Sequence, residues 1–127
     1  MTAMLRRDGH LVEGSAAVEL VAEIGAEPSD LVSHRRHGVS PFHGTSLDPT
    51  LRALGVSTVV ATGVSLNLGV LGLAIEAVNL GYQVVAAIDA MTGVPLDYVE
   101  SVVRHTLALV ATVSTVDDLV QALEPTT

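Results

Sequence analysis

The chain contains no cysteine, no lysine and no tryptophan, and its 127 residues include only two Tyr and one Phe. The absence of cysteine excludes disulfide bonds, thiolate metal sites and a cysteine nucleophile. Because aromatic residues are scarce, the hydrophobic core has to be built from Val, Leu, Ile and Ala, within a hydrophobic fraction of 49%. Such side chains suit a parallel sheet that is buried on both faces.

Positive charge is also scarce: six arginines stand against fourteen acidic residues, so the net charge is −8. A nucleic-acid-binding protein needs a basic stripe, and the sequence has none. One apolar run, residues 59–75, is about as long as a short membrane span. Residues 62–65 and Asn67 interrupt it where a strand would turn into a helix, so a buried strand–turn–helix is expected instead. The N-terminus is not a signal peptide, and we expect a cytoplasmic protein with no nucleic-acid or membrane partner.

Strand and helix patterns alternate along the chain. β-branched and apolar runs indicate strands, and apolar residues spaced three and four apart indicate helices. The predicted strands are 31–33, 57–62, 82–88 and 111–114, and the predicted helices are 15–24, 47–54, 67–80, 95–109 and 116–123. This alternation predicts one α/β domain over residues 1–127, a three-layer α/β/α structure with a mostly parallel, doubly wound sheet.

Ligands of such sheets bind beyond the carboxyl ends of the strands. The candidate loops are therefore residues 34–45, 63–67 and 89–95. The first loop carries His34, His37 and His43, which admit either a metal site or a solvated polar loop. Three histidines on an irregular loop do not fix a coordination geometry, and we predict no metal and no cofactor. Asp89 follows a strand, where ligand binding and helix capping explain it equally well.

Three motifs follow one another from residue 40. The first is Ser40-Pro41-Phe42-His43-Gly44-Thr45, followed by Leu47-Asp48 and Leu51-Arg52; the second is LGVSTVVATGVSLN at 54–67; the third is AVNLGYQVV at 77–85, followed by Asp89-Ala90. Their sequence, order and spacing resemble the isochorismatase-like cysteine hydrolases, a family that includes nicotinamidases and N-carbamoylsarcosine amidohydrolases. The resemblance covers nearly the whole chain and implies a Rossmann-like fold that lacks its first strand, first helix and second strand.

The chain departs from the family at each position of the catalytic triad. The family's cysteine nucleophile corresponds to Gly69, and its lysine corresponds to Arg36. Its aspartate would lie on the first strand, before the region that this chain resembles. A cysteine hydrolase needs a thiolate, a nearby cation that lowers the thiol pKa and a carboxylate base. No intact catalytic residue is therefore expected, and arginine is a poor proton donor because it stays charged.

The resemblance also implies that a ligand site is retained although the catalytic triad is not. Backbone N–H groups of Ser65 and Gly69 would form an oxyanion hole beside a non-proline cis peptide at Val64–Ser65. We predict that Ser65, Gly69, Phe42 and Asn67 bind a small carboxylate or amide. For Phe42, packing in the core is an equally good explanation. Ser65 is expected to be a turn residue and not a replacement nucleophile, since its surroundings fall short of the G-x-S-x-G elbow.

Three functions stay open. The chain is a non-catalytic member that binds a small molecule or a partner chain, an active hydrolase of altered mechanism in a longer form, or a fragment without independent function. Arg35 and Arg36 either bind an anionic ligand or form a solvated pair. A sheet that lacks strands has an open edge and exposed apolar helix faces, so we predict a homo-oligomer.

Overall fold

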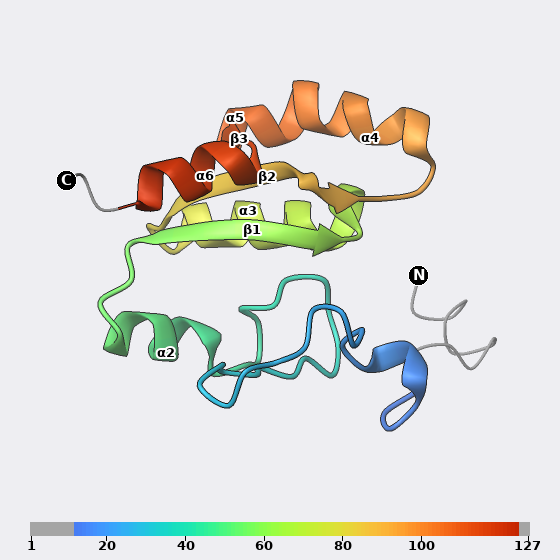
Figure 1. Ribbon diagram of the computed structural model, residues 1–127, viewed down its shortest axis with the longest axis vertical. Coiled ribbons are helices and arrows are strands. Elements are labelled where there is room, and N and C mark those ends of the chain that lie inside the picture. The colour runs from blue at the N-terminus through green and yellow to red at the C-terminus, as the bar shows by residue number, and fades with distance from the viewer. Residues whose placement is uncertain (1–11, 125–127) are drawn as a thin grey trace. The chain divides into compact units, whose positions relative to one another are not determined.

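The computed structural model describes residues 12–124 (Figure 1). Contacts within the chain separate two units, Met1–Val32 and Ser33–Thr127. Among the described residues, the second unit holds all three strands and every helix except one short turn. The sheet and the candidate site both belong to this second unit.

The described part of the first unit contains a single regular element, the 3-10 helix η1 (Ala16–Val18). The helix predicted over residues 15–24 therefore does not form beyond this one turn. The side chains of Leu20, Val21 and Ile24 are all more than half exposed. A short helix is marginal in water unless its apolar face is buried, and here that burial is missing. The strand predicted at 31–33 is likewise absent, and Leu31 and Val32 remain exposed.

The second unit alternates helices and strands in the predicted order. Its elements are α2 (Leu47–Ala53), β1 (Thr58–Val64), η2 (Leu66–Val70), α3 (Leu71–Asn79), β2 (Gln83–Thr92), α4 (Leu96–Val102), η3 (Val103–Leu107), α5 (Ala108–Val110), β3 (Thr112–Ser114) and α6 (Val116–Leu123). The π-helical turn η2 runs directly into α3, and η3 joins α4 to α5. Gly55 and Gly81 follow α2 and α3 with φ angles of 70° and 90°, the left-handed conformation that ends many helices.

The three strands form one parallel sheet in the order β1-β2-β3. Thr58 of β1 lies opposite Gln83 of β2, and Val85 of β2 lies opposite Thr112 of β3. The register of β1 against β2 shifts between Ala61 and Gly63, close to the carboxyl end of β1. Within the described residues, β1 forms one edge of the sheet.

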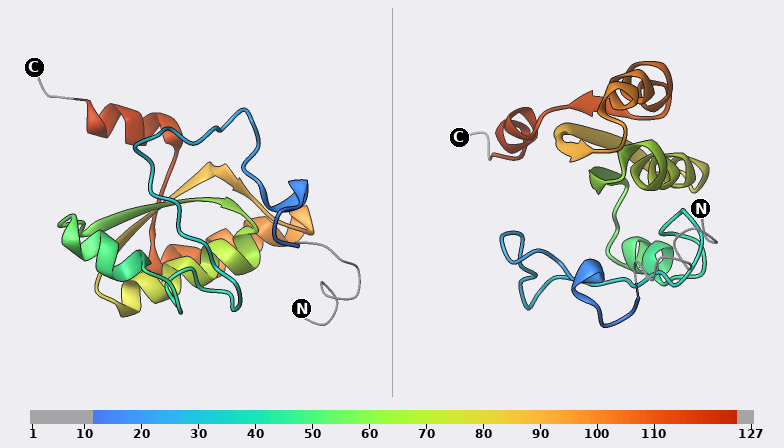
Figure 2. Two further views of the ribbon diagram at one scale, coloured as in Figure 1. Left: turned by 90° about the horizontal axis from the view of Figure 1, so that it is seen from below. Right: turned by 90° about the vertical axis from the view of Figure 1, so that its right-hand side faces the viewer.

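Helices cover the two faces of this sheet. Helix α3 packs against β1, β2 and α5 on one face, and α6 packs against β2 (Figure 2). The views of Figure 2 place α6 on the face opposite α3 and α4. The predicted α/β fold, with a parallel sheet and flanking helices, is therefore confirmed.

The hydrophobic core lies between α3 and the sheet. Small and aliphatic side chains dominate it, as the composition predicts, and its two aromatic residues stack with their ring centroids 5.9 Å apart. The buried residues of this cluster are Phe42, Ala61, Val70, Ala74, Ala77, Tyr82, Val84, Ala86 and Leu107.

A polar cluster attaches α2 to the start of β2. The hydroxyl of Tyr82 donates to Asp48 Oδ1 at 2.8 Å, and Arg52 Nε lies 3.0 Å from the same carboxylate oxygen. Arg52 also donates through Nη2 to the carbonyl of Leu80 at 2.8 Å. The hydrogen bond from Tyr82, followed by that from Arg52, lowers the pKa of Asp48. Burial, followed by the hydrogen bond to Asp48, raises the pKa of Tyr82.

Candidate ligand pocket at the carboxyl end of β1

A cavity of about 370 Å³ lies at the carboxyl end of β1, where the chain turns into η2. Three segments line it: the loop before α2, the end of β1, and the first turns of η2 and α3. The lining residues are Ser33, His34, Arg35, Pro41, Thr62, Val64, Gly69, Val70 and Leu73. The position agrees with the rule that open α/β sheets bind ligands at the carboxyl ends of their strands.

The turn between β1 and η2 forms one side of the cavity. Gly63 has a φ angle of 108°, and the peptide bond between Val64 and Ser65 is cis, as the family resemblance implies. The backbone N–H groups of Leu68 and Val70 both donate to the carbonyl of Ser65, at 3.3 and 3.0 Å. The turn is thereby joined to the first turn of the helix.

Gly69 lies on this first helical turn and faces the cavity. A Cβ atom added to it would have only one neighbour within 4 Å, the carbonyl oxygen of Val64 at 3.8 Å. Its φ angle lies outside the left-handed region. Neither backbone conformation nor packing therefore requires glycine here, and the space that a side chain would occupy is open.

The opposite wall belongs to the loop before α2, and close packing against α3 holds it. A Cβ atom on Gly72 would come within 2.8 Å of Val39 Cγ1, so the absence of a side chain lets the loop approach the helix. The guanidinium of Arg35 donates through Nη1 to the carbonyl of Val39. This contact places a cation on the cavity wall next to His34.

A hydrogen-bonded bridge connects the turn after β1 to the loop after β2. Ser65 Oγ donates to Asn67 Oδ1 at 3.1 Å, and Asn67 Nδ2 donates to the carbonyl of Val94 at 3.0 Å. We call Ser65, Asn67 and Val94 together the Asn67 bridge. It joins two of the three candidate segments, although β2 extends to Thr92, beyond the predicted end at residue 88, and leaves only the last residues of the segment 89–95 outside the strand.

The structure assigns the predicted site residues to different surroundings. Gly69 lines the cavity, whereas Ser65 and Asn67 form the bridge and are not lining residues. Phe42 is buried in the core against Tyr82 and is not a lining residue. Arg36 is exposed and is not a lining residue; the arginine that lines the cavity is its neighbour Arg35.

Two further candidate groups are located by the structure. The carboxylate of Asp89 accepts a hydrogen bond from the N–H of Val116 at 3.0 Å, so it caps the start of α6. His37 and His43 lie edge to face with ring centroids 6.2 Å apart. Within residues 12–124, no group of three or more His, Asp or Glu side chains is close enough together to hold a metal ion.

Sequence reasoning missed the lining residues Thr62 and Leu73 and the loop residue Gly93. Thr62 falls on the predicted strand and Leu73 on the predicted helix, and strand alternation and helical period give no sign of which side chains border a cavity. Gly93 is buried, and its role depends on a residue 26 positions earlier in the sequence. Its place in the loop after a predicted strand was the only available signal.

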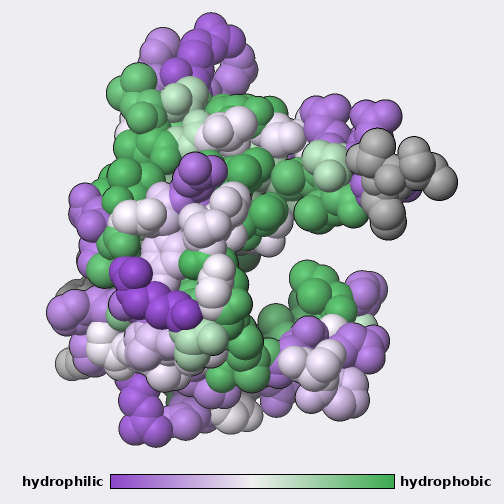
Figure 3. Space-filling model, turned by 90° about the vertical axis from the view of Figure 1, so that its left-hand side faces the viewer, coloured by the Kyte–Doolittle hydropathy of each residue, from purple (hydrophilic) through white to green (hydrophobic). Residues whose placement is uncertain are grey.

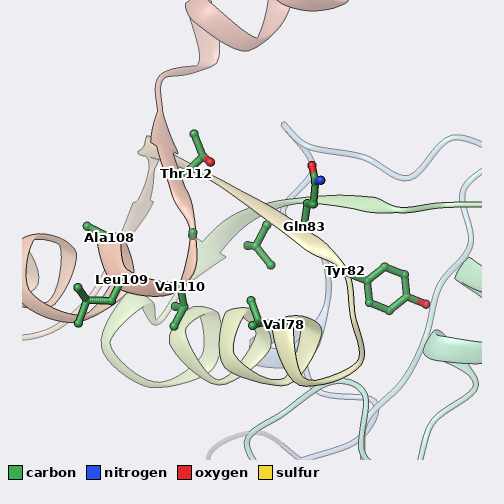
Figure 4. A pocket seen from close by; sticks show the side chains of 9 residues that line it. Val78, Tyr82, Gln83, Ala108, Leu109, Val110 and Thr112 are labelled. Atoms are coloured by element: carbon green, nitrogen blue, oxygen red, sulfur yellow. The ribbon is translucent and has the colours of Figure 1, made fainter.

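A second cavity, of about 320 Å³, lies at the opposite end of the sheet (Figure 4). It is bounded by the last turns of α3, the start of β2 and the turn from α5 to β3. Val78, Leu109 and Val110 contribute apolar walls, and the ring of Tyr82 points away from them toward α2. None of its lining residues is charged, so it offers no group that would orient an ionised ligand.

Apolar side chains are also exposed on the surface, as the green areas of Figure 3 show for one side of the molecule. In the second unit, the large apolar residues with more than 45% exposure are Leu54, Val60, Val64, Val94, Leu96, Tyr98, Leu109, Val120 and Leu123. None of the helices over residues 12–124 is both long and apolar enough to span a bilayer. The cytoplasmic location expected from the sequence stays a prediction.

A family profile and two curated relatives show which known proteins this chain is similar to. The profile of the isochorismatase domain matches residues 1–118. The isochorismatase family protein YecD of Escherichia coli O157:H7 is 34% identical over 103 residues, which cover 80% of this chain and 54% of YecD. The ureidoacrylate amidohydrolase RutB of Variovorax paradoxus is 33% identical over 120 residues, which cover 92% of this chain and 46% of RutB. The chain thus spans about half the length of these curated relatives.

A solved structure supports the same grouping. The crystal structure of an isochorismatase-like hydrolase from Alkaliphilus metalliredigens superimposes with a TM-score of 0.85 at 30% sequence identity. The superposition covers 91% of this chain and 63% of the other. The parallel sheet and its helices therefore correspond to part of a longer domain in that hydrolase.

Proposed function

The chain belongs to the isochorismatase family, and from this membership we propose that it binds a small carboxylate or amide beside Gly69 without hydrolysing it. One observation carries the proposal: the residue at the family's nucleophile position faces a cavity and has no side chain. The cavity at the carboxyl end of β1 is thus compatible with a ligand, while the group that would attack the ligand is missing.

The chemistry of the cavity favours binding over turnover. Hydrolysis by the family route needs a thiolate, and the chain contains no cysteine. The hydroxyl of Ser65 donates to the amide oxygen of Asn67, so it points at an acceptor that cannot remove its proton. The guanidinium of Arg35 is suited to pair with an anion and not to donate a proton in catalysis.

The cavity walls also indicate the class of ligand. Arg35 and His34 lie on the loop side, and an arginine guanidinium pairs well with a carboxylate. Val64, Val70 and Leu73 give the cavity an apolar side. A volume of about 370 Å³ falls at the small end of ligand sites in proteins. We therefore propose a small ligand with one carboxylate or amide group and one apolar part.

A binding and turnover experiment on the full chain tests this proposal. Ureidoacrylate, the compound in the name of one relative, is titrated by calorimetry together with benzamide and benzoate, which carry an amide or a carboxylate on one apolar group. We expect saturable binding of at least one compound and no product by chromatography. Hydrolysis that a single substitution abolishes would instead identify an enzyme of altered mechanism.

A matched pair of variants locates the binding. Gly69→Leu places a side chain in the cavity and should abolish binding. The fold should accept this side chain, because only the carbonyl of Val64 lies near the added Cβ. Ala122→Leu makes a similar change at an exposed position of α6 and should leave binding intact. Equal affinity of both variants would exclude this cavity as the site.

We further propose that two copies of the chain associate through β1. This edge strand, Thr58–Val64, contains neither a charged residue nor proline, the usual means by which edge strands avoid pairing. Val60 and Val64 are 47% and 75% exposed. Sedimentation velocity should show a dimer or larger species, and Val60→Lys should shift it toward the monomer. A soluble monomer with cooperative unfolding would contradict association, and a chain that neither binds nor forms discrete oligomers would favour the fragment interpretation.

A further inference from the structure

Asn67 occupies a position between two loops and does not line the cavity. Its amide accepts a hydrogen bond from Ser65 Oγ at 3.1 Å and donates one to the carbonyl of Val94 at 3.0 Å. The oxygen and the nitrogen of the side-chain amide are therefore each hydrogen-bonded within the protein. An asparagine used in this way orients the two segments that it connects.

The loop after β2 is shaped to receive this side chain. Gly93 is buried, and a Cβ atom added to it would lie 2.7 Å from Asn67 Oδ1 and 3.2 Å from Val99 Cγ2. The first distance is shorter than the contacts that real Cβ atoms make, and the second is tighter than most of them. Glycine at 93 is thus required for the amide of Asn67 to reach the carbonyl of the next residue, Val94.

The bridge fixes the part of the chain that bounds the cavity. Ser65 follows the lining residue Val64 directly, and Gly69 lies two residues after Asn67 on the same helical turn. We propose that Asn67 is a positioning residue, which holds Val64 and Gly69 in place by tying their turn to the loop at Gly93 and Val94. This inference rests on the proposed function in one respect: the cavity whose wall Asn67 positions is taken to be the ligand site.

The position of Gly69 relative to the opposite cavity wall can be measured without any ligand, through a single engineered thiol. Because the chain has no cysteine, Gly69→Cys introduces a single thiol on the cavity wall that Arg35 and His34 share. Only the thiolate reacts with iodoacetamide, so the pH profile of alkylation gives the thiol pKa in its surroundings. A nearby cation lowers this pKa, and movement of the turn away from the opposite wall weakens that effect.

The decisive comparison is Asn67→Ala against Asn79→Ala, both in the Gly69→Cys background. Asn79 is exposed at the end of α3, and the chain has no other asparagine. Asn67→Ala should raise the thiol pKa and slow alkylation at pH 7 by about threefold, the effect of half a pKa unit on the thiolate fraction. Asn79→Ala should leave the profile unchanged. An unchanged or faster profile for Asn67→Ala, in protein that is still folded, overturns the proposal.

Gly93→Ala is the second variant and decides the question if Asn67→Ala does not fold. Its methyl group displaces the amide without removing it, so the same slowing of alkylation is expected. The unfolding midpoint is measured for each variant, because a purely structural role would lower it without moving the thiol pKa. A displaced thiol pKa in a chain that binds none of the test compounds would contradict the proposed function alone. Binding with an undisturbed thiol pKa would contradict the role of Asn67 alone.

Discussion

The two ends of the sheet use polar side chains in different ways. At the amino end, the ionised pair of Asp48 and Arg52 and the hydroxyl of Tyr82 join α2 to β2. At the carboxyl end, the neutral Asn67 bridge joins two loops, and an open cavity lies beside it. The first arrangement joins packed elements and stabilises the fold, whereas the second leaves space beside Gly69. Stability and ligand binding should therefore respond to different substitutions.

The largest effect on stability is expected from Phe42→Ala. Phe42 is 7% exposed and stacks on Tyr82 in the core. Truncation of a buried phenylalanine costs about 3–5 kcal/mol of unfolding free energy, since it leaves a cavity and removes apolar contacts. Urea unfolding followed by circular dichroism measures the change.

Phe42→Leu, which keeps most of the volume, is the control and should cost clearly less. The same variants also test the comparison between the two ends of the sheet. If Phe42→Ala abolishes ligand binding while the midpoint of unfolding stays the same, the residue acts at the ligand site, as the family resemblance implies, and not as a core residue.

Two glycines on one helix give the next prediction. Gly72→Ala brings a methyl group within 2.8 Å of Val39 Cγ1, and overpacking of this kind costs about 1–3 kcal/mol. Gly69→Ala meets only one atom, at 3.8 Å, so the helix should gain about 0.5–1 kcal/mol from the lost flexibility of glycine. Differential scanning calorimetry should thus show a lower melting temperature for Gly72→Ala and a higher one for Gly69→Ala than for the parent chain. If both melting temperatures change in the same direction, the loop before α2 moves to accommodate the added methyl group. Arg35 is then not held at the cavity wall.

Much of the second unit could be predicted from its sequence because each element has a local signal. α6 begins and ends at the predicted residues, Val116 and Leu123, since Thr115 caps it and accepts a hydrogen bond from the N–H of Asp118 at 3.2 Å. The predicted helix over 15–24 shows the limit of such signals. Its apolar spacing is helical, but spacing stabilises a helix only where another surface buries the apolar face.

The candidate site was predictable in its position and not in its details. The motif around Gly63 and the family resemblance indicated the turn and its cis peptide, whereas the correspondence of Gly69 to the family's nucleophile stays a prediction. The roles of Asn67 and Gly93 depend on a contact between two loops, and no local pattern encodes such a contact. The choice between Arg35 and Arg36 depends on side-chain direction in an irregular loop, which lacks the periodicity that fixes directions in helices and strands.

The smallest expected effect concerns the pH dependence of stability at the amino end of the sheet. The pKa of Asp48 is lowered in the folded state, so its contribution is fully present above the unfolded value of about 3.9 and is lost as the pH falls below it. The pKa of Tyr82 is raised, so its contribution is fully present below about pH 10 and is lost as the pH rises further. Tyr82→Phe removes the main cause of the lowered Asp48 pKa, and the loss of stability as the pH falls below about 3.9 should become shallower than in the parent chain.

Tyr98→Phe is the matched control for this prediction, because Tyr98 is the other tyrosine and is 53% exposed. Its midpoint of urea unfolding should follow the parent chain at every pH. If Tyr82→Phe also follows the parent curve, Arg52 alone sustains the low pKa of Asp48, since it lies 3.0 Å from the carboxylate. The hydroxyl of Tyr82 would then contribute only its neutral hydrogen bond, and the difference between the two ends of the sheet would reduce to one ion pair.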